Sequence, residues 1–318
     1  MTKKAIVKRA VRMQNPPEIP IRFFNRDKEK SYIQETGYAA PHNFHPADPR
    51  QTEWGFHWER LDNTMGQPKG CPLADLDLLD QFIPPDPNAE GRFDHVDHFI
   101  RQNANAYLLG NVGISGFNFV TFLHGFENTL EDLYLDRDRI CQLIDLVLEF
   151  ETGIIRRYGE YAFDAIGFGD DWGTQNALMI APDLWREVFK PRFKKQFDLV
   201  HSYGKDVYYH SCGQIWDIIP DLIEIGVDIL NLNQPDIFGI ERLGTAFSGK
   251  VCFNCPVDHQ TVAIHGDRGE IFEYVRRLNA NLGNHGGGFI GYIEEYSSVG
   301  MSEANYQAIV EAFEGLNR

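Results

Sequence analysis

The C-terminal half of the chain alternates short apolar runs with longer amphipathic stretches. The runs at residues 163–169, 206–210, 227–233, 250–255 and 287–293 have the length and composition of buried strands. Between them, apolar residues recur at helical spacing, most clearly over 181–204, where Pro191 predicts a kink and Gly204 a stop. Strand and helix in alternation predict parallel strands joined by right-handed crossovers. Five such strands in series favour a barrel over an open sheet.

The N-terminal half has a weaker pattern. Residues 19–24 and 105–113 are predicted to be strands, and a long helix is predicted to begin at Asp136. Residues 38–97 are rich in Pro, Asp, His and Trp, which indicates either a long insertion or a set of active-site loops. The sequence therefore predicts an α/β fold, a single (β/α)8 TIM barrel over residues 1–318, with an N-terminal extension and a loop-rich insertion in the first half.

Composition narrows the class of protein. The 318 residues would fit two average domains or one large barrel, so length alone does not decide. A net charge of -16 disfavours binding to nucleic acid or anionic lipid, and no apolar run is long enough to span a membrane. The basic start "KKAIVKRAVR" resembles a targeting peptide but is better interpreted as an ordinary helix. Five irregularly spaced cysteines indicate free thiols, so we expect a soluble, cytoplasmic protein.

Polar residues follow each predicted strand of the C-terminal half, where a barrel carries its active site. We expect Asp170 and Asp171 to act in catalysis, although they could instead cap a helix. The remaining polar residues near these strand ends could tie loops together, but we expect them to bind a small-molecule substrate: Gln175, Tyr208, Asn231, Asn233, Gln234 and Asp258.

His210 and Cys212 lie two positions apart at the end of a predicted strand, so their side chains point to the same face. Imidazole and thiolate are zinc ligands, and a catalytic zinc site has three protein ligands and an open position. The third ligand must come from another strand, and the candidates are Glu295, Glu294 and Cys255. The alternative is a packed histidine beside a buried cysteine.

Several segments together resemble the uroporphyrinogen decarboxylase superfamily, whose other branch contains cobalamin-dependent methyltransferases. The resemblance is strong over "GDDWGTQNALMIAPDLWREVFKPRFKKQFDLVHSYGKDVYYHSCG", "IPDLIEIGVDILNLNQ" and "CPVDHQ", and weaker over "NPPEIPIRFF", "TEWGFHWE" and "FLHGFENTLEDLY". It implies a single (β/α)8 barrel. Decarboxylases of the superfamily carry an R-Q-A-G-R motif after the first strand to bind a tetrapyrrole with eight carboxylates. This chain has "IRFFNRDKEK" at that place, with Arg22 and Arg26 but no such motif.

The methyltransferase branch carries H-x-C and a distant cysteine as zinc ligands. His210 and Cys212 match the first two, and counting back from "MSEAN" puts the third on Glu295. The resemblance thus implies a zinc-dependent methyltransferase that moves a methyl group between a corrinoid on a partner protein and a small thiol or methoxy substrate. Two alternatives stay open. One is a metal-independent decarboxylase of a tetrapyrrole or smaller acid, with Asp170 or Asp171 as proton donor, and the other is a non-catalytic corrinoid or tetrapyrrole binder.

Overall fold

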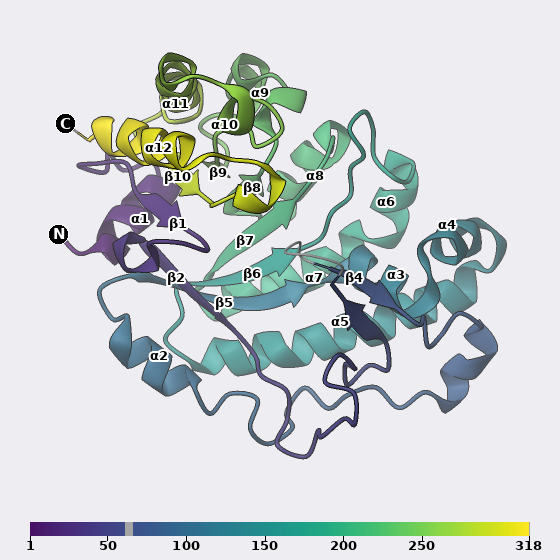
Figure 1. The fold of residues 1–318 in the computed structure, drawn as a ribbon. Helices are drawn as coiled ribbons and strands as arrows, with labels where there is room; N and C mark the ends of the chain where they lie inside the picture. Colours follow the sequence, from purple (N-terminus) through teal and green to yellow (C-terminus); the bar gives the residue numbers. More distant parts are fainter. Residues whose placement is uncertain (61–65, 318) are drawn as a thin grey trace.

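A computed structural model describes residues 1–60 and 66–317 of the chain, and eight of its strands form one sheet in which every pair of neighbours is parallel (Figure 1). The order in the sheet is β1-β10-β9-β8-β7-β6-β5-β2. The strands are β1 (Ile21–Phe23), β2 (Ile33–Gly37), β5 (Tyr107–Ile114), β6 (Ala165–Gly169), β7 (Asp206–Ser211), β8 (Ile229–Leu232), β9 (Cys252–Cys255) and β10 (Phe289–Ile293). The two ends of the sheet meet where the Tyr32 amide donates a 2.9 Å hydrogen bond to the Ile21 carbonyl. The predicted (β/α)8 barrel is confirmed.

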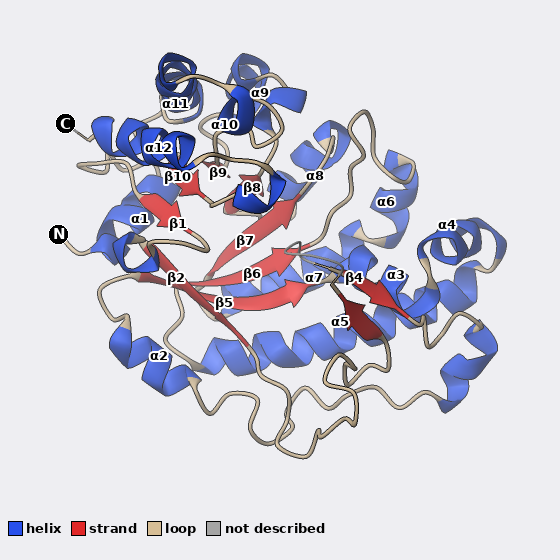
Figure 2. Ribbon diagram, viewed as in Figure 1, coloured by secondary structure: helices blue, strands red, loops and turns tan. Residues whose placement is uncertain are grey.

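Helices surround this sheet, most of them on its outer face (Figure 2). They are α1 (Lys3–Val11), α2 (Val96–Gln102), α3 (Gly116–His124), α4 (Phe126–Leu135), α5 (Arg137–Glu160), α6 (Pro182–Val188), α7 (Lys190–Ser202), α8 (Ile219–Glu224), α9 (Ile240–Phe247), α10 (Val262–His265), α11 (Arg268–Leu282) and α12 (Glu303–Gly315). The predicted start at Asp136 is confirmed, because its side chain accepts the Arg139 amide at 3.4 Å and caps α5. The predicted kink is also present, since α6 and α7 separate at Phe189, just before Pro191.

Side chains alternate along each strand between two separate cores. The larger core lies between the sheet and the helices. The smaller one fills the barrel and contains Leu109, Ala165, Tyr208, Ile229 and Ile290, among others. These interior positions fix which later residue of each strand faces the barrel axis.

Helix α1 closes one end of the barrel. Its apolar residues Val7, Ala10 and Val11 belong to the interior core. On its polar side, Lys4 and Lys8 form ion pairs of 3.0 and 2.8 Å with Asp164, at the start of β6. The basic start therefore forms a helix that packs against one end of the barrel, and the strands finish at the opposite end, where a barrel carries its active site.

The segment between β2 and α2 carries the irregular part of the first half. It contains the antiparallel pair β3 (His57–Glu59) and β4 (Gln67–Lys69) and the short helix η2 (Leu76–Gln81). Phe56 and Trp58 from this segment contact the ring of Phe122 in α3, at centroid distances of 5.7 and 5.9 Å. Because α3 follows β5 directly, this segment borders the open end of the barrel.

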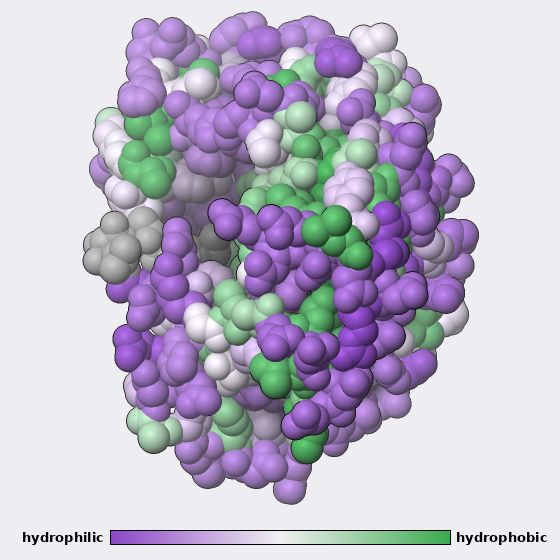
Figure 3. Space-filling model, turned by 90° about the vertical axis from the view of Figure 1, so that its right-hand side faces the viewer, coloured by the Kyte–Doolittle hydropathy of each residue, from purple (hydrophilic) through white to green (hydrophobic). Residues whose placement is uncertain are grey.

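Hydrophilic side chains predominate on the face of the molecule shown in Figure 3, with apolar ones between them. The most exposed large apolar side chains of α4 are Tyr134 and Leu135, at 63% and 79% exposure.

Over residues 1–60 and 66–317, no helix combines the length and the apolar character that a membrane crossing requires.

Candidate metal centre

Strands β6 and β7 bring three donor side chains to the open end of the barrel. Gly169 is the register partner of His210, so Asp171 and Cys212 each lie two residues further along neighbouring strands. Ala165 and Tyr208 face the barrel interior. By the alternation of strand side chains, Asp171, His210 and Cys212 then face the same side.

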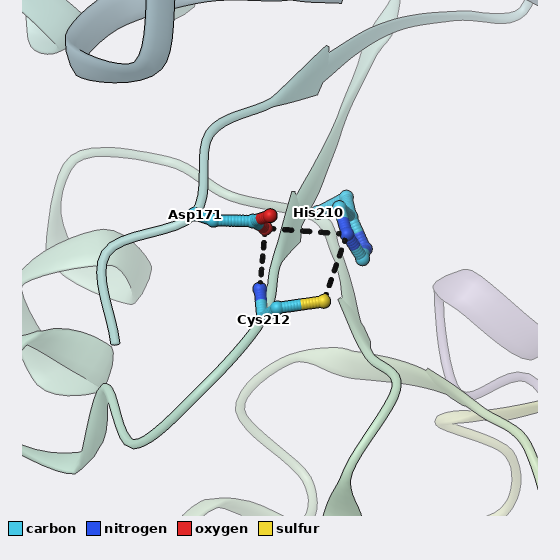
Figure 4. A group of neighbouring side chains, drawn as sticks. All are labelled: Asp171, His210 and Cys212. Atoms are coloured by element: carbon cyan, nitrogen blue, oxygen red, sulfur yellow. Dashed lines mark hydrogen bonds and ion pairs between the residues drawn. The ribbon is translucent and has the colours of Figure 1, made fainter. Parts of the chain in front are cut away.

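The three donors converge on one point (Figure 4). One ligand atom from each of Asp171, His210 and Cys212 lies within 4.8 Å of the other two. His210 Nε2 is 3.5 Å from Cys212 Sγ and 3.4 Å from Asp171 Oδ1. Zinc bonds of about 2.0–2.3 Å in a tetrahedral site place ligand atoms about 3.3–3.8 Å apart. Both distances from His210 Nε2 fall in that range, and the nitrogen, oxygen and sulfur donors suit zinc.

The ring of His210 is oriented by Asn231. His210 Nδ1 donates to Asn231 Oδ1 at 2.8 Å, while Asn231 Nδ2 donates to the Asn254 carbonyl at 2.6 Å. The second bond fixes the amide of Asn231, so its oxygen faces the imidazole. Nδ1 therefore carries the hydrogen and Nε2 is presented to the other two donors, as in many histidine metal ligands.

Charges within the cluster act on one another. Burial by itself would lower the pKa of His210, but Cys212 and Asp171 raise it well above its usual range. Burial would raise the pKa of Asp171, but hydrogen bonds from His210 and from the Cys212 amide (2.7 Å) lower it. The cluster thus stabilises a positive charge at its centre, which is the property that a cation site needs.

Two glycines hold the loops after β6 and β7 together. The Gly173 amide donates to the Cys212 carbonyl at 3.2 Å, and the Gln214 amide donates to the Thr174 carbonyl at 2.7 Å. Gly213 has φ +77°, and a Cβ there would lie 2.0 Å from the Gly173 oxygen. Only glycine permits this approach, which keeps Asp171 beside Cys212.

Asp170 follows β6 directly but is not part of the cluster of Asp171, His210 and Cys212. It faces away from the barrel axis, is fully buried, and accepts the amides of Phe117 and Asn118 at 3.0 and 2.9 Å. Burial raises its pKa well above the usual range. Asp170 therefore caps the first turn of α3, which precedes it in the chain, whereas the alternative drawn from the sequence was a cap of a helix that follows it.

Asn118 then contacts the cluster from α3. Its Oδ1 accepts the Asp171 amide at 2.6 Å, and its Nδ2 donates to the Asp171 carbonyl at 3.3 Å. Sequence reasoning did not single out Asn118, because a residue in the first turn of a helix carries no signal for contact with a distant strand end.

The structure does not bring the expected third ligands into this group. Glu295 Oε1 accepts the Ser297 amide at 2.9 Å, and alternation from Ile290 directs Glu294, rather than Glu295, toward the interior. Glu294 Oε2 accepts the hydroxyls of Tyr292 and Tyr296 at 2.7 and 2.9 Å. Cys255 is packed in the outer core, where burial raises its pKa to about 12.

The expected substrate-binding residues are dispersed. Tyr208 and Asn231 lie on the barrel interior near His210, and Asn233 Oδ1 accepts from Asn231 at 3.3 Å. Gln234 Oε1 accepts the Gly213 amide at 3.0 Å and so supports the loop. Asp258 is buried and accepts the Gln260 amide at 2.8 Å, whereas Gln175 is exposed in the loop after β6.

A buried ion pair lies deeper in the barrel. Arg22 Nη2 donates to Glu35 Oε2 at 2.7 Å, and its Nη1 donates to the Tyr208 hydroxyl. The Tyr208 hydroxyl donates in turn to Asn254 Oδ1 at 2.8 Å. Glu35 lies on β2, a strand that the sequence pattern missed.

Comparison with known proteins assigns this chain to a family. Residues 69–315 match the uroporphyrinogen decarboxylase (URO-D) family. The chain belongs to the URO-D family. None of the curated proteins compared with this URO-D chain matches it significantly in sequence.

Solved structures align with this URO-D protein at low sequence identity. A methyltransferase from Methanosarcina mazei aligns with a TM-score of 0.62 and 17% identity, over 80% of this chain and 74% of that one. Xylanase 10B from Thermotoga maritima gives a TM-score of 0.46 and 11% identity, over 100% and 99% of the two chains. An endo-β-1,4-xylanase from Gloeophyllum trabeum gives a TM-score of 0.45 and 12% identity, over 73% of this chain and 83% of that one.

Proposed function

We propose that this URO-D family protein is a zinc-dependent methyltransferase that moves a methyl group between a corrinoid on a partner protein and a small thiol or methoxy substrate. The observation that carries the proposal is the convergence of Asp171, His210 and Cys212 at the open end of the barrel. The methyltransferase of Methanosarcina mazei, which shares the fold, supports the choice of branch within the family.

In this proposal Asp171 is the third protein ligand, in place of Glu295 or Cys255. The support is geometric, because Asp171 Oδ1 is 3.4 Å from His210 Nε2 while Glu295 is engaged with the Ser297 amide. A carboxylate is a harder ligand than a thiolate, so one sulfur, one nitrogen and one oxygen would hold the ion.

The chain's own residues would bind and orient this centre. Asn231 holds the hydrogen on His210 Nδ1, and Asn118 holds the backbone of Asp171. Zinc, when bound, supplies a Lewis acid that favours the thiolate form of a thiol or polarises the oxygen of a methoxy group. The loops joined at Gly173 and Gly213 keep the donors in place while substrate enters from the mouth of the barrel.

The competing proposal is a metal-independent decarboxylase in which Asp171 donates a proton. A tetrapyrrole with many carboxylates needs dedicated cations. Arg22, the buried cation of β1, is already paired with Glu35 and bonded to Tyr208. This pairing favours the methyltransferase over a tetrapyrrole decarboxylase.

We also propose that residues 1–318 act as one barrel domain and that the protein works in the cytoplasm. All five cysteines are free thiols, which suits a reducing compartment. The acid excess of the chain argues against nucleic acid as a partner.

Zinc content of the purified protein tests the proposed function. We expect about one zinc per chain in the wild type, and less than about a tenth of that in Cys212→Ser and Asp171→Asn, because neither replacement supplies an anionic ligand. Cys141→Ser, on α5, is the matched control and should retain zinc. Full zinc in Cys212→Ser would refute the metal centre, and release of carbon dioxide by the metal-free protein would favour the decarboxylase.

A further inference from the structure

A second candidate site lies beside the metal centre, over the ends of β2 and β5. It is a pocket of about 560 Å³, and five of its lining residues are aromatic: Tyr38, Phe56, Trp58, Phe119 and Phe122. Its volume is in the range of sites that enclose small molecules. Such a concentration of rings in one pocket indicates a ligand that carries a flat apolar ring.

The rings of this pocket brace one another. Phe56 contacts Phe119 and Phe122 edge to face, at centroid distances of 5.8 and 5.7 Å, and Phe119 lies 6.0 Å from Phe122. Trp58 meets Phe122 edge to face at 5.9 Å. Because these four rings contact one another, the wall that they form is ordered before a ligand arrives. A flat ring placed against it would gain the further stabilisation that aromatic pairs provide.

The pocket opens at the same end of the barrel as the metal centre. Strand β5 is hydrogen-bonded to β6, and the end of β5, residues 111–114, forms part of the pocket wall. Phe119 also lines the pocket, and its neighbour Asn118 holds both backbone groups of Asp171. A ring bound in this pocket would therefore lie one strand away from the donor cluster.

The charged lining residues are not equivalent. Glu35 is neutralised by Arg22 at 2.7 Å. Lys28 is exposed, and its ammonium makes no ion pair within the part of the chain that the structure describes. The pocket thus combines an aromatic wall with one uncompensated positive charge at its rim, which suits an anionic group on the ligand.

We propose that this pocket binds the substrate and that the substrate is a planar aromatic carboxylate rather than a small aliphatic thiol. The proposal rests on the proposed function, in the direction that takes the methyl group from a methoxy substrate to the corrinoid. The methoxy group would be carried on the aromatic ring. Binding itself needs neither zinc nor a corrinoid, so it can be measured separately from the metal centre.

Calorimetric titration of the full-length protein with 4-methoxybenzoate tests this site. We expect saturable binding to both zinc-loaded and chelator-treated protein, with affinity reduced at least ten-fold in Phe119→Leu and Phe122→Leu. In Lys28→Gln the preference for 4-methoxybenzoate over neutral 4-methoxybenzamide should disappear. Tyr134→Leu, an exposed ring on α4 outside this pocket, is the control and should bind as the wild type does.

The results separate this proposal from the proposed function. Absence of saturable binding below 10 mM, or equal affinity in wild type and both ring variants with unchanged melting temperatures, would overturn the aromatic site even if zinc is present. Equal wild-type affinity for carboxylate and carboxamide would overturn the anionic part. Lys28 is exposed, so its variant gives a reading even if a ring variant does not fold.

Discussion

Glu151 should make the stability of this protein depend on pH. Its side chain lies on α5 and is 3% exposed, with Oε1 accepting the Gly116 amide at 2.8 Å and Oε2 accepting from Gln196 at 3.0 Å. Burial, only partly offset by these two bonds, raises the pKa of Glu151 to about 7 from an ordinary 4.5. Near neutral pH this carboxyl therefore holds a proton in the folded protein that it loses on unfolding.

The direction and size of the pH effect on the free energy of unfolding follow from the raised pKa of Glu151. A group whose pKa is raised in the folded state stabilises the fold below its unfolded pKa, and that stabilisation is lost as pH rises through 7. Over pH 5 to 8 the free energy of unfolding should fall by about 2.5 kcal/mol on account of Glu151, at about 1.36 kcal/mol per pKa unit. Glu151→Gln removes the titration but keeps the size and one acceptor oxygen for the Gly116 amide.

Urea unfolding at pH 5 and pH 8 measures this effect. The difference in unfolding free energy, wild type minus Glu151→Gln, should fall by about 2.5 kcal/mol between the two pH values. Glu149→Gln, on the exposed face of the same helix, is the matched control, and its difference from wild type should stay constant. A Glu151→Gln difference that changes by less than about 0.5 kcal/mol would refute the buried, protonated carboxyl. The site depends on this contact, because Glu151 binds the first residue of α3, the helix that carries Asn118 to Asp171.

Further predictions concern the support of the metal centre and the barrel core. Asn231→Ala should weaken zinc binding by about 10- to 100-fold in chelator competition, whereas Asn233→Ala, one step further from His210, should change it much less. Gly213→Ala should also lower zinc affinity at least ten-fold, because its Cβ would collide with Gly173. Gly204→Ala is the control, since Gly204 also has a positive φ but lies in open space, and this variant should keep the zinc affinity of the wild type. Leu109→Ala should lower the free energy of unfolding by about 2–5 kcal/mol in urea titrations, because the side chain is fully buried inside the barrel.

The C-terminal half of the fold could be predicted because its strands are nearly continuous apolar runs, buried on both faces. Strand β2 could not, because its residues Gln34, Glu35 and Thr36 are polar, and Glu35 is compensated by Arg22 from another strand. Helix α3 was also not predicted, because its rings Phe119 and Phe122 contact Phe56 of the irregular segment instead of forming a simple amphipathic face.

At the site, the spacing of His210 and Cys212 was informative because strand side chains alternate. Asp171 was expected to be catalytic rather than a metal ligand, and the sequence shows Asp170 and Asp171 side by side but not which one faces the barrel axis. The register of Gly169 with His210 decides this, and it could have been anticipated by aligning the ends of the two predicted strands. The same uncertainty applied to Glu294 and Glu295, because one residue of register reverses the face, and alternation from Ile290 directs Glu294 to the interior.

The X-ray absorption spectrum of the zinc-loaded protein tests the central claim most directly, because it distinguishes sulfur from nitrogen and oxygen ligands. With Asp171, His210 and Cys212 as the protein ligands, we predict one sulfur at about 2.3 Å and the remaining ligands, nitrogen or oxygen, at about 2.0–2.2 Å. Asp171→Cys should raise the count to two sulfurs, whereas Glu295→Gln should leave the spectrum unchanged. Two sulfurs in the wild type would assign Cys255 or another cysteine to the metal, and a spectrum without sulfur would contradict the proposed centre.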